Sequence, residues 1–519
     1  MKGTVNNGNP EPDQIFMPSL CQDLSKNARS WPDSIAVSDG QLSWTWSQFE
    51  DVVGNIGQQL RRLGAGSGSA VSVYMPNNAT YIAAVYAIWS IGAAFCPINY
   101  RLSVVEAGHM MIDAKVSIAI VDDEGTNLPS EEISTIERSD AIRPLSEIAL
   151  DYQAIGADEP AWLFFTSGTS GRPKPAVITH RQLDAVVSNG VIDLMRGLTR
   201  SDAALAVAPL SHGALTHVLR QVRIGGHTVV YDRRRFEEQN VLDLIAQQSI
   251  RSTFLVPTMV RRLCDAAKGN NYHGTLTHLL SGGEPITRGL VESVENIFGR
   301  VLTNYYGLAE VTGAIAQALP EAVHTATSGP VPVGQPRIGT AIELRRDDGM
   351  LAEGGEHGEI WVSGSNMFAG YLIDGSIDRS ELVDGWFRTK DIGYFRNGTL
   401  YVDGRSSDMY ISGGSNVYPA EVERTLNSHP NVKHAAVVGV EDTEWGEVGI
   451  AFIIPASGGV NEDDLMQLVK TQLGSYKTPK YFERVGSFPY TPMDKIDKKA
   501  LKHSYLRRSR PEGAIDGNS

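Results

Sequence analysis

The sequence has few cysteines, no excess of basic residues and no long apolar run. Its three cysteines are scattered and odd in number, which excludes a disulfide framework or a cysteine-based metal site and fits a reducing cytoplasm. The formal net charge of −14 argues against a nucleic-acid partner, because that binding depends on basic surface. Residues 83–98, the most apolar window, are too few to span a membrane, and residues 1–14 lack the apolar core of a signal peptide. We expect a cytoplasmic protein with neither a membrane nor a nucleic-acid partner.

At 519 residues the chain is longer than one hydrophobic core usually supports, so a large domain and a smaller one are expected. Short apolar strands such as residues 71–75 alternate with helix-length segments such as residues 81–90, which predicts parallel, helix-covered sheets. Towards the end of the chain, residues 432–440 predict a strand, and Asn461 predicts the start of a helix that ends at Gly474. The predicted fold class is therefore α/β, with a large multi-sheet N-terminal domain and a small C-terminal α/β domain.

A stretch rich in hydroxyls and glycines separates two apolar strands, at residues 161–165 and 176–178. Glycine lets backbone amides approach a ligand, each hydroxyl can donate a hydrogen bond, and Lys174 adds a point charge, so the stretch suits a polyphosphate. A solvated turn is the usual alternative for such a cluster, but the apolar flanks and the lysine weigh against it. The candidate phosphate-binding residues are Thr166, Ser167, Gly168, Thr169, Ser170, Gly171 and Lys174.

This stretch is not a Walker A motif, because Gly168 and Gly171 are too close together and Lys174 is followed by Pro175. A kinase or GTPase of the usual kind is therefore disfavoured. The stretch instead resembles the signature loop of the adenylate-forming superfamily, which includes acyl- and aryl-CoA synthetases, peptide-synthetase adenylation domains and luciferases. Only the last glycine of that signature differs, and Pro175 stands in its place.

Further motifs follow in the order in which the family carries them, and the resemblance covers the chain apart from its two tails. They occupy residues 206–214, 279–285, 304–310, 384–393, 401–423 and 488–501. The resemblance implies a large adenylation domain, a hinge, a small mobile C-terminal domain and two disordered tails. The expected boundaries are 1–16 for the first tail, 17–404 for the large domain, 405–407 for the hinge around Ser407, 408–505 for the small domain and 506–519 for the last tail.

The resemblance implies that the protein binds ATP and Mg²⁺. Tyr306 is expected to stack on adenine, and Asn304 to pair its amide with the adenine edge. Asp391 is expected to accept from both ribose hydroxyls, an apt task for a carboxylate, and Arg405 to contact the ribose. Glu310 is expected to help hold Mg²⁺. The other candidate nucleotide-binding residues are Gly282, Gly283, Glu284, Pro285, Tyr305 and Gly307.

The same resemblance implies an acid pocket and a set of catalytic groups. The candidate catalytic residues are Lys495, His212 and Glu310. Outside the family pattern, His212 would be interpreted as a core histidine and Lys495 as a solvated charge. The candidate acid pocket comprises His212, Gly213, Val256, Gly282, Tyr305 and Gly313. This mixture of small and aromatic residues favours a flat aryl acid over a long fatty chain.

The implied activity is ATP-dependent activation of a small carboxylic acid through an acyl-adenylate, with release of pyrophosphate, followed by transfer of the acyl group. The expected acid is an aryl or medium-size acid, and the expected acceptor is the thiol of CoA, which acts as a co-substrate. The alternative is an amide synthetase that passes the acyl-adenylate to an amine without CoA. A catalytically dead nucleotide-binding protein is disfavoured, because Glu310, Asp391, Arg405 and Lys495 are all present.

Overall fold

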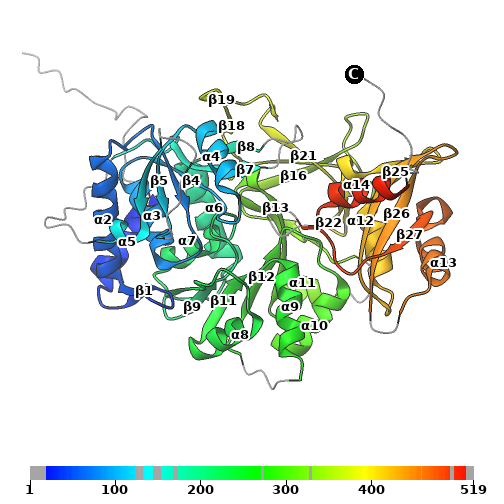
Figure 1. Ribbon diagram of the computed structural model, residues 1–519, viewed down its shortest axis with the longest axis horizontal. Coiled ribbons are helices and arrows are strands. Elements are labelled where there is room, and N and C mark those ends of the chain that lie inside the picture. The colour runs from blue at the N-terminus through cyan, green and yellow to red at the C-terminus, as the bar shows by residue number, and fades with distance from the viewer. Residues whose placement is uncertain are drawn as a thin grey trace, which may run out of the picture.

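The structure is a computed structural model (Figure 1). The residues that it describes are 19–123, 128, 133–143, 154–166, 173–269, 274–325, 330–456, 459–490 and 496–509.

One sheet contains the apolar strands on both sides of the hydroxyl–glycine stretch. Its strands, in spatial order, are β19 (Ser376–Asp378), β18 (Gly370–Ile373), β8 (Lys174–Thr179), β7 (Pro160–Thr166), β4 (Ala94–Pro97), β3 (Ala70–Tyr74), β5 (Val116–Val121) and β6 (Ser134–Glu137). β7 pairs in parallel with β4 and antiparallel with β8. The two apolar flanks of the hydroxyl–glycine stretch are strands, as predicted, and the structure adds that these strands are neighbours and antiparallel.

A second sheet is mostly parallel and provides the floor of the site described below. Its strands, in spatial order, are β15 (Gln335–Pro336), β14 (Gly313–Ala318), β13 (Leu302–Leu308), β12 (His278–Gly282), β11 (Ile250–Phe254), β9 (Ala203–Ala206), β10 (Thr228–Val230), β1 (Ile35–Ser38) and β2 (Ser43–Thr45). The helices that connect or cover the strands of these two sheets are α1 (Ser19–Ser30), α2 (Trp46–Arg62), α3 (Ala79–Ser90), α4 (Val104–Asp113), α5 (Arg138–Ala141), α6 (His180–Asp193), α7 (Leu215–Arg223), α8 (Glu238–Gln247), α9 (Pro257–Ala267), α10 (Arg288–Phe298) and α11 (Pro320–Thr325).

Helix α3 shows how the two sheets share a core. Every residue of α3 is buried, which is expected of a helix that is apolar on all sides. Its N-terminus is fixed by Asn78, whose side chain accepts a hydrogen bond from the Tyr81 backbone at 2.8 Å. α3 and α7 belong to the same hydrophobic core as β3, β4 and β7.

A third, antiparallel sheet follows and leads to the C-terminal part. Its strands are β16 (Thr340–Arg345), β17 (Gly358–Gly364), β20 (Leu382–Val383), β21 (Trp386–Arg396) and β22 (Thr399–Arg405). The short 3₁₀ helices η1 (Ala309–Val311) and η2 (Ser406–Asp408) follow β13 and β22 respectively. The predicted hinge residue, Ser407, lies in η2.

The C-terminal part is a separate α/β sandwich, seen on the right of Figure 1. Its elements are β23 (Tyr410–Ser412), β24 (Ser415–Val417), α12 (Pro419–Asn427), β25 (Val432–Asp442), β26 (Gly446–Pro455), α13 (Glu462–Leu473), η3 (Ser475–Lys477), β27 (Tyr481–Arg484) and α14 (Lys498–Ser509). Ala435 and Val437 of β25 pack with α12 and α13, whereas Ala436 and Val438 pack with Leu501 of α14. This period of two gives the sheet two buried faces.

The predicted fold class is confirmed. The predicted strand at 432–440 is β25, and Asn461 is the N-cap of α13, with its side chain accepting from the Asp463 backbone at 3.1 Å. α14 continues to Ser509, beyond residue 506, where the sequence places the start of the last tail. Within the described part of the chain, no helix combines the length and the apolar character that a membrane crossing requires.

Candidate active site

A cavity of about 290 Å³ lies at the carboxyl ends of β11, β12 and β13, beside the paired strands β7 and β8. β11, β12 and β13 run parallel, and ligands in open α/β sheets bind at the carboxyl ends of such strands. Phe254, Gly282 and Tyr305 line the cavity from these three strands. Lys174 lines it from β8, and Arg405 lines it from β22 of the third sheet.

The cavity brings together most of the predicted site residues that the structure describes. Those that line it are Thr166, Lys174, His212, Gly213, Val256, Gly282, Gly283, Tyr305, Gly307, Glu310, Gly313, Arg405 and Ser407. Five other described candidates are not among the lining residues, namely Glu284, Pro285, Asn304, Tyr306 and Asp391. The candidates Ser167, Gly168, Thr169, Ser170, Gly171 and Lys495 lie outside the described residues.

Tyr371 of β18, which the sequence motifs do not mark, connects two of the predicted site residues. Its hydroxyl donates a hydrogen bond to Glu310 Oε1 at 2.7 Å, and the Nζ of Lys174 lies 5.8 Å from the centre of its ring. Burial, followed by the charge of Glu310, raises the pKa of Tyr371 well above its usual value. The phenol therefore stays protonated and can orient the Glu310 carboxylate at the cavity wall. A tyrosine in an apolar strand gives no sequence signal for this task.

Thr166 and Lys174 are cross-strand partners at the ends of β7 and β8. The register therefore holds both ends of the predicted phosphate loop at the edge of the cavity. Pro175 is paired with Phe165 in the same ladder, so the residue that departs from the family signature lies within a strand.

Asp391 lies between Tyr306 and Arg405. The Tyr306 hydroxyl donates to Asp391 Oδ2 at 2.5 Å, and Arg405 Nε lies 3.4 Å from Asp391 Oδ1. Asp391 and Arg405 are also cross-strand partners in β21 and β22. Burial, followed by the Asp391 carboxylate, raises the pKa of Tyr306, so this phenol too remains a donor. The carboxylate is thereby fixed next to a residue that lines the cavity.

Two further candidates have their polar groups engaged within the protein. The side-chain amide of Asn304 donates to the Pro332 carbonyl at 2.8 Å, and Asn304 is buried. Glu284 accepts a hydrogen bond from the Thr258 hydroxyl at 2.8 Å. Neither is among the lining residues. For Asn304 the reason is strand alternation, which directs it to the face of β13 opposite to that of Tyr305.

Aromatic rings form the other end of the cavity. Tyr305 stacks on Phe254 with 5.6 Å between ring centres, and Phe164 and His212 meet edge to face at 6.1 Å. His212 Nδ1 lies 2.8 Å from the Ser211 hydroxyl oxygen. A Cβ on Gly282 would lie 2.5 Å from the Tyr305 carbonyl oxygen, so only glycine allows β12 and β13 to approach as they do. Burial raises the pKa of Tyr305 to about 12.

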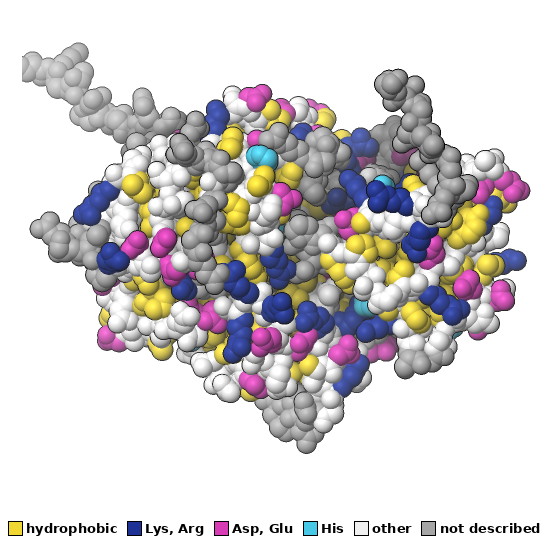
Figure 2. Space-filling view, in the orientation of Figure 1, with side chains coloured by type: hydrophobic (Ala, Val, Ile, Leu, Met, Phe, Trp, Pro, Cys, Tyr) yellow, Lys and Arg dark blue, Asp and Glu magenta, His cyan; other side chains and the backbone are white. Residues whose placement is uncertain are grey.

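Charge is distributed unevenly over the molecule. Although the formal net charge is −14, Lys and Arg side chains gather across the centre of the face shown in Figure 2. A local basic surface can attract an anionic ligand even when the total charge is negative.

Comparison with known proteins gives a consistent match along the chain. Residues 24–372 match the model of the AMP-binding enzyme family, and residues 421–495 match the model of the AMP-binding enzyme C-terminal domain. A 2-succinylbenzoate–CoA ligase of Bacillus licheniformis is 33% identical, over 92% of this chain and 98% of the relative. A feruloyl-CoA synthase of Amycolatopsis sp is 32% identical, over 92% of this chain and 98% of that protein.

Solved structures are also similar to this chain over nearly its whole length. An o-succinylbenzoate CoA synthetase of Bacillus subtilis, in complex with its acyl-adenylate intermediate, superposes with a TM-score of 0.82 at 28% identity and covers 96% of this chain and 99% of its own. An amide bond synthetase of Marinactinospora thermotolerans superposes with a TM-score of 0.83 at 25% identity and covers 94% of this chain and 100% of its own.

Proposed function

The chain belongs to the AMP-binding enzyme family, and we propose that it activates an aryl carboxylic acid with ATP and then passes the acyl group to the thiol of CoA. It is an AMP-forming acid–thiol ligase. The observation that carries this proposal is the cavity in which Lys174, His212, Glu310 and Arg405, which come from separate motifs, meet. The buried, free cysteines support a reducing, cytoplasmic location.

In the first half-reaction a carboxylate oxygen of the acid attacks the α-phosphorus of ATP. A new oxygen–phosphorus bond forms, the bond from the α-phosphorus to the bridging oxygen breaks, and pyrophosphate leaves. Both reactants are anions, so the protein must hold them in line and supply positive charge. We assign the β- and γ-phosphates to Thr166, Lys174 and the loop between them, and the ribose to Asp391 and Arg405. Lys495 is assigned to bridge the carboxylate and the α-phosphate in the transition state.

The residues at Glu310 fit Mg²⁺. In the described part of the chain, no cluster of three or more His, Cys, Asp or Glu side chains is suited to holding a metal. Mg²⁺ is usually held by one or two carboxylates together with substrate phosphates, so a single glutamate beside the phosphate loop suits it. Bound there, it would neutralise charge on the phosphates. Tyr371 orients the carboxylate through its 2.7 Å hydrogen bond.

The proposed acid is a flat aryl acid. Phe254 and Tyr305 form a stacked pair, and Phe164 lies edge-on to His212, whereas Gly282 keeps the space between β12 and β13 narrow. Aromatic walls with a few polar groups suit a planar ring better than a flexible chain. Two of the relatives are named for aryl acids, 2-succinylbenzoate and ferulate.

In the second half-reaction the thiol of CoA loses its proton to solvent, and its sulfur attacks the acyl carbon of the adenylate. A carbon–sulfur bond forms, the bond from the acyl carbon to the phosphate oxygen breaks, and AMP leaves. We assign the large domain to residues 17–404, the hinge to residues 405–407 and the small domain to residues 408–505. Rotation about Ser407 would withdraw Lys495 and admit the thiol, and the small side chain at this position suits a hinge.

Mass spectrometry of the products tests this proposal. The full-length protein is incubated with Mg·ATP and a pool of aryl and aliphatic acids, in one tube with CoA and in another with simple amines. We expect AMP, pyrophosphate and an aryl thioester in the CoA tube. An amide in the amine tube, with adenylate but no thioester in the CoA tube, would make the protein an amide synthetase. No adenylate from any acid would contradict the assignment as a ligase of this class.

A further inference from the structure

Arg220 is a buried arginine whose charge has no direct partner among the described residues. It lies on α7 and is 2% exposed. Its Nε is buried without a hydrogen-bond partner, and its guanidinium makes no hydrogen bond or ion pair with any residue in the described part of the chain. A guanidinium carries five donors, and burial of an unpaired charge is strongly destabilising. Such a group is expected only where a ligand or an unusual constraint compensates for it.

Arg337 provides a contrast in the same region. It is 4% exposed, and its Nε and one terminal nitrogen donate to the two carboxylate oxygens of Asp193 at 2.9 and 2.8 Å. Arg220 is influenced by both members of this pair. Two guanidiniums therefore share one carboxylate, and one positive charge is left over. Burial, followed by Arg337, lowers the pKa of Arg220 to about 10, so it still carries its charge at neutral pH.

A glycine on the neighbouring helix leaves space for the guanidinium of Arg220. Gly190 lies within α6, beside α7 (Figure 1). A Cβ at Gly190 would collide with the Nε and Cδ of Arg220. Glycine within a helix is destabilising relative to alanine, so α6 gives up helix stability at the point where Arg220 lies. The position of the charge is therefore built into two helices.

Arg220 is not itself a lining residue of the cavity, but it lies behind two residues that are, Thr216 and Tyr305. It follows Thr216, a lining residue, by one helical turn on the same face of α7. Tyr305, which lines the cavity, interacts electrostatically with Arg220, and its hydroxyl makes no hydrogen bond with any described residue. Gln317, the cross-strand partner of Tyr305 on β14, has a buried Oε1 that no described residue hydrogen-bonds. The unsatisfied polar groups of Arg220 and Gln317 thus both lie near Tyr305, which forms part of the cavity wall.

The neighbouring histidine, His217, adds no charge to the region. His217 Nε2 lies 3.2 Å from the Ser252 hydroxyl oxygen, and its Nδ1 is buried without a hydrogen-bond partner in the part of the chain that the structure describes. Burial, followed by the charge of Arg220, lowers the pKa of His217 to about 3, so this ring is neutral at physiological pH. The excess positive charge of the region is therefore that of Arg220.

We propose that Arg220 and the Tyr305 hydroxyl recognise a second carboxylate of the acid substrate, at the end of the molecule remote from the carboxylate that is adenylated. A carboxylate can accept both from a guanidinium and from a phenol, and it supplies the one negative charge that the region lacks. A trapped water would satisfy donors but would leave the charge uncompensated. This inference rests on the proposed function and narrows the substrate class to aryl dicarboxylic acids.

Matched pairs of acids test this selectivity. The pairs are benzoate and terephthalate, cinnamate and 4-carboxycinnamate, and 4-oxo-4-phenylbutanoate and 2-succinylbenzoate, assayed by acid-dependent ATP–pyrophosphate exchange with the full-length protein. In each pair that supports exchange, we expect kcat/KM to be about 10- to 100-fold higher for the dicarboxylic acid, because a hydrogen bond to a charged group contributes this much. Arg220→Met is expected to remove the preference, and Arg220→Lys to retain part of it.

Arg223→Met is the control on the same helix. Arg223 is an arginine with partners, because it binds Asp23 at 2.6 Å and Asp184 at 2.7 Å. Its loss is expected to lower the melting temperature and leave the acid preference unchanged. Arg220→Met is expected to raise the melting temperature or leave it unchanged, because an unpaired buried charge is removed. A marked fall in melting temperature with no change in the acid preference would show that Arg220 is structural and would overturn the inference.

A binding measurement separates this inference from the proposed function. We expect terephthalate or 2-succinylbenzoate to raise the melting temperature of the wild-type protein more than its matched monoacid, and this difference to vanish in Arg220→Met. If no acid supports exchange, the proposed function fails, and the melting shifts still decide whether Arg220 binds a carboxylate. If exchange occurs but the monoacids are preferred in wild type, or Arg220→Met lowers both members of a pair equally, the inference fails and the ligase assignment remains.

Discussion

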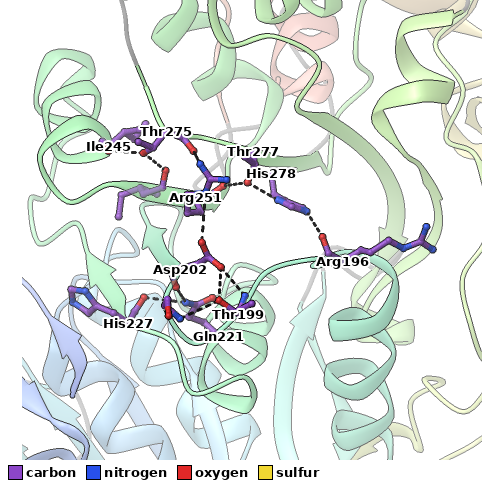
Figure 3. Close-up of polar contacts among 12 residues, drawn as sticks. Arg196, Thr199, Asp202, Gln221, His227, Ile245, Arg251, Thr275, Thr277 and His278 are labelled. Atoms are coloured by element: carbon purple, nitrogen blue, oxygen red, sulfur yellow. Dashed lines mark hydrogen bonds and ion pairs between the residues drawn. The ribbon is translucent and has the colours of Figure 1, made fainter. Parts of the chain in front are cut away.

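At the amino ends of β9, β11 and β12 the polar side chains bind one another (Figure 3), whereas at the carboxyl ends of β11 to β13 they face a cavity. In the network of Figure 3, Asp202 accepts from the Thr199 backbone and hydroxyl at 2.8 and 2.9 Å, and it lies 3.6 Å from Arg251 Nε. His278 Nε2 lies 3.1 Å from the Arg196 carbonyl oxygen. These contacts tie the loops before the strands to each other.

The opposite ends of the same sheet leave several polar groups open. Lys174, Glu310 and Arg405 line the cavity there, and Gln317 Oε1, on the strand paired with Tyr305, is buried without a hydrogen-bond partner among the described residues. Buried polar groups in native proteins are satisfied with few exceptions, and each exception calls for a reason. The difference indicates that the amino ends serve stability, whereas the carboxyl ends are arranged for a ligand.

The largest effect is expected at Lys495, the lysine that we propose to be catalytic. Lys495→Ala should lower ATP–pyrophosphate exchange by about a thousandfold or more, because in the proposed role the lysine neutralises charge that develops in the first transition state. Thioester formation from supplied acyl-adenylate should remain. Lys498→Ala, which removes a nearby lysine bound to Glu423 at 2.7 Å, is the control and should keep both activities. Equal loss of both half-reactions in Lys495→Ala would refute the assigned role.

Tyr371→Phe, a change in the cavity wall contributed by β18 of the other large-domain sheet, should have a moderate effect. The variant removes the donor that orients Glu310 and leaves the ring beside Lys174 in place. We expect kcat to fall about tenfold and the Mg²⁺ concentration at half-maximal exchange to rise, since one hydrogen bond to a charged group is lost. The measurement is exchange as a function of Mg²⁺ concentration. An unchanged Mg²⁺ dependence would separate Tyr371 from the metal site.

Local sequence patterns predicted much of the fold. The apolar flanks at 161–165 and 176–178 became β7 and β8, and Asn461 caps α13 as its side chain suggests. These features depend on residues close together in the chain, so propensity and capping rules suffice. The resemblance to the family predicted the enzyme class, and the comparisons confirm it.

Residues whose importance depends on distant neighbours were not predictable. Arg220 lies in an amphipathic helix, where an arginine is usually solvated, and only Gly190 and Arg337 from other segments reveal its buried position. Tyr371 gains its significance from Glu310, which is far from it in sequence. The motif around Tyr306 shows a related limit, since strand alternation places Tyr305 in the cavity wall and directs Tyr306 to Asp391 instead.

Asp202→Ala tests the other side of the comparison. The variant removes the acceptor for the Thr199 backbone N–H and the carboxylate beside Arg251. We expect the free energy of unfolding to fall by about 1–2 kcal/mol, as for the loss of partly buried hydrogen bonds, while kcat/KM of the folded protein stays unchanged. Denaturant unfolding and exchange assays on the same sample measure both. A large loss of activity without a loss of stability would mean that the network communicates with the cavity.

The smallest effect concerns His227, whose Nε2 lies 2.7 Å from the Ser38 hydroxyl oxygen. Burial lowers the pKa of His227 to about 4, below the value of 6.5 that it has when exposed. Between these pH values the unfolded chain binds a proton that the folded chain does not, so stability declines as the pH falls from about 6.5 towards 4. His227→Gln removes this contribution, whose slope is at most about 1.4 kcal/mol per pH unit.

The free energy of unfolding, measured from pH 7 to pH 5, should therefore depend less on pH in His227→Gln than in wild type. His503→Gln is the control, because His503 is exposed on α14, and it should match wild type. Exchange activity at pH 7 should be unaffected by either change. If His227→Gln and wild type lose stability in parallel on acidification, the His227 ring binds its proton as readily in the folded protein as in the unfolded chain. The amino-end network would then be more open to solvent than its hydrogen bonds indicate, and the contrast with the cavity end would be correspondingly weaker.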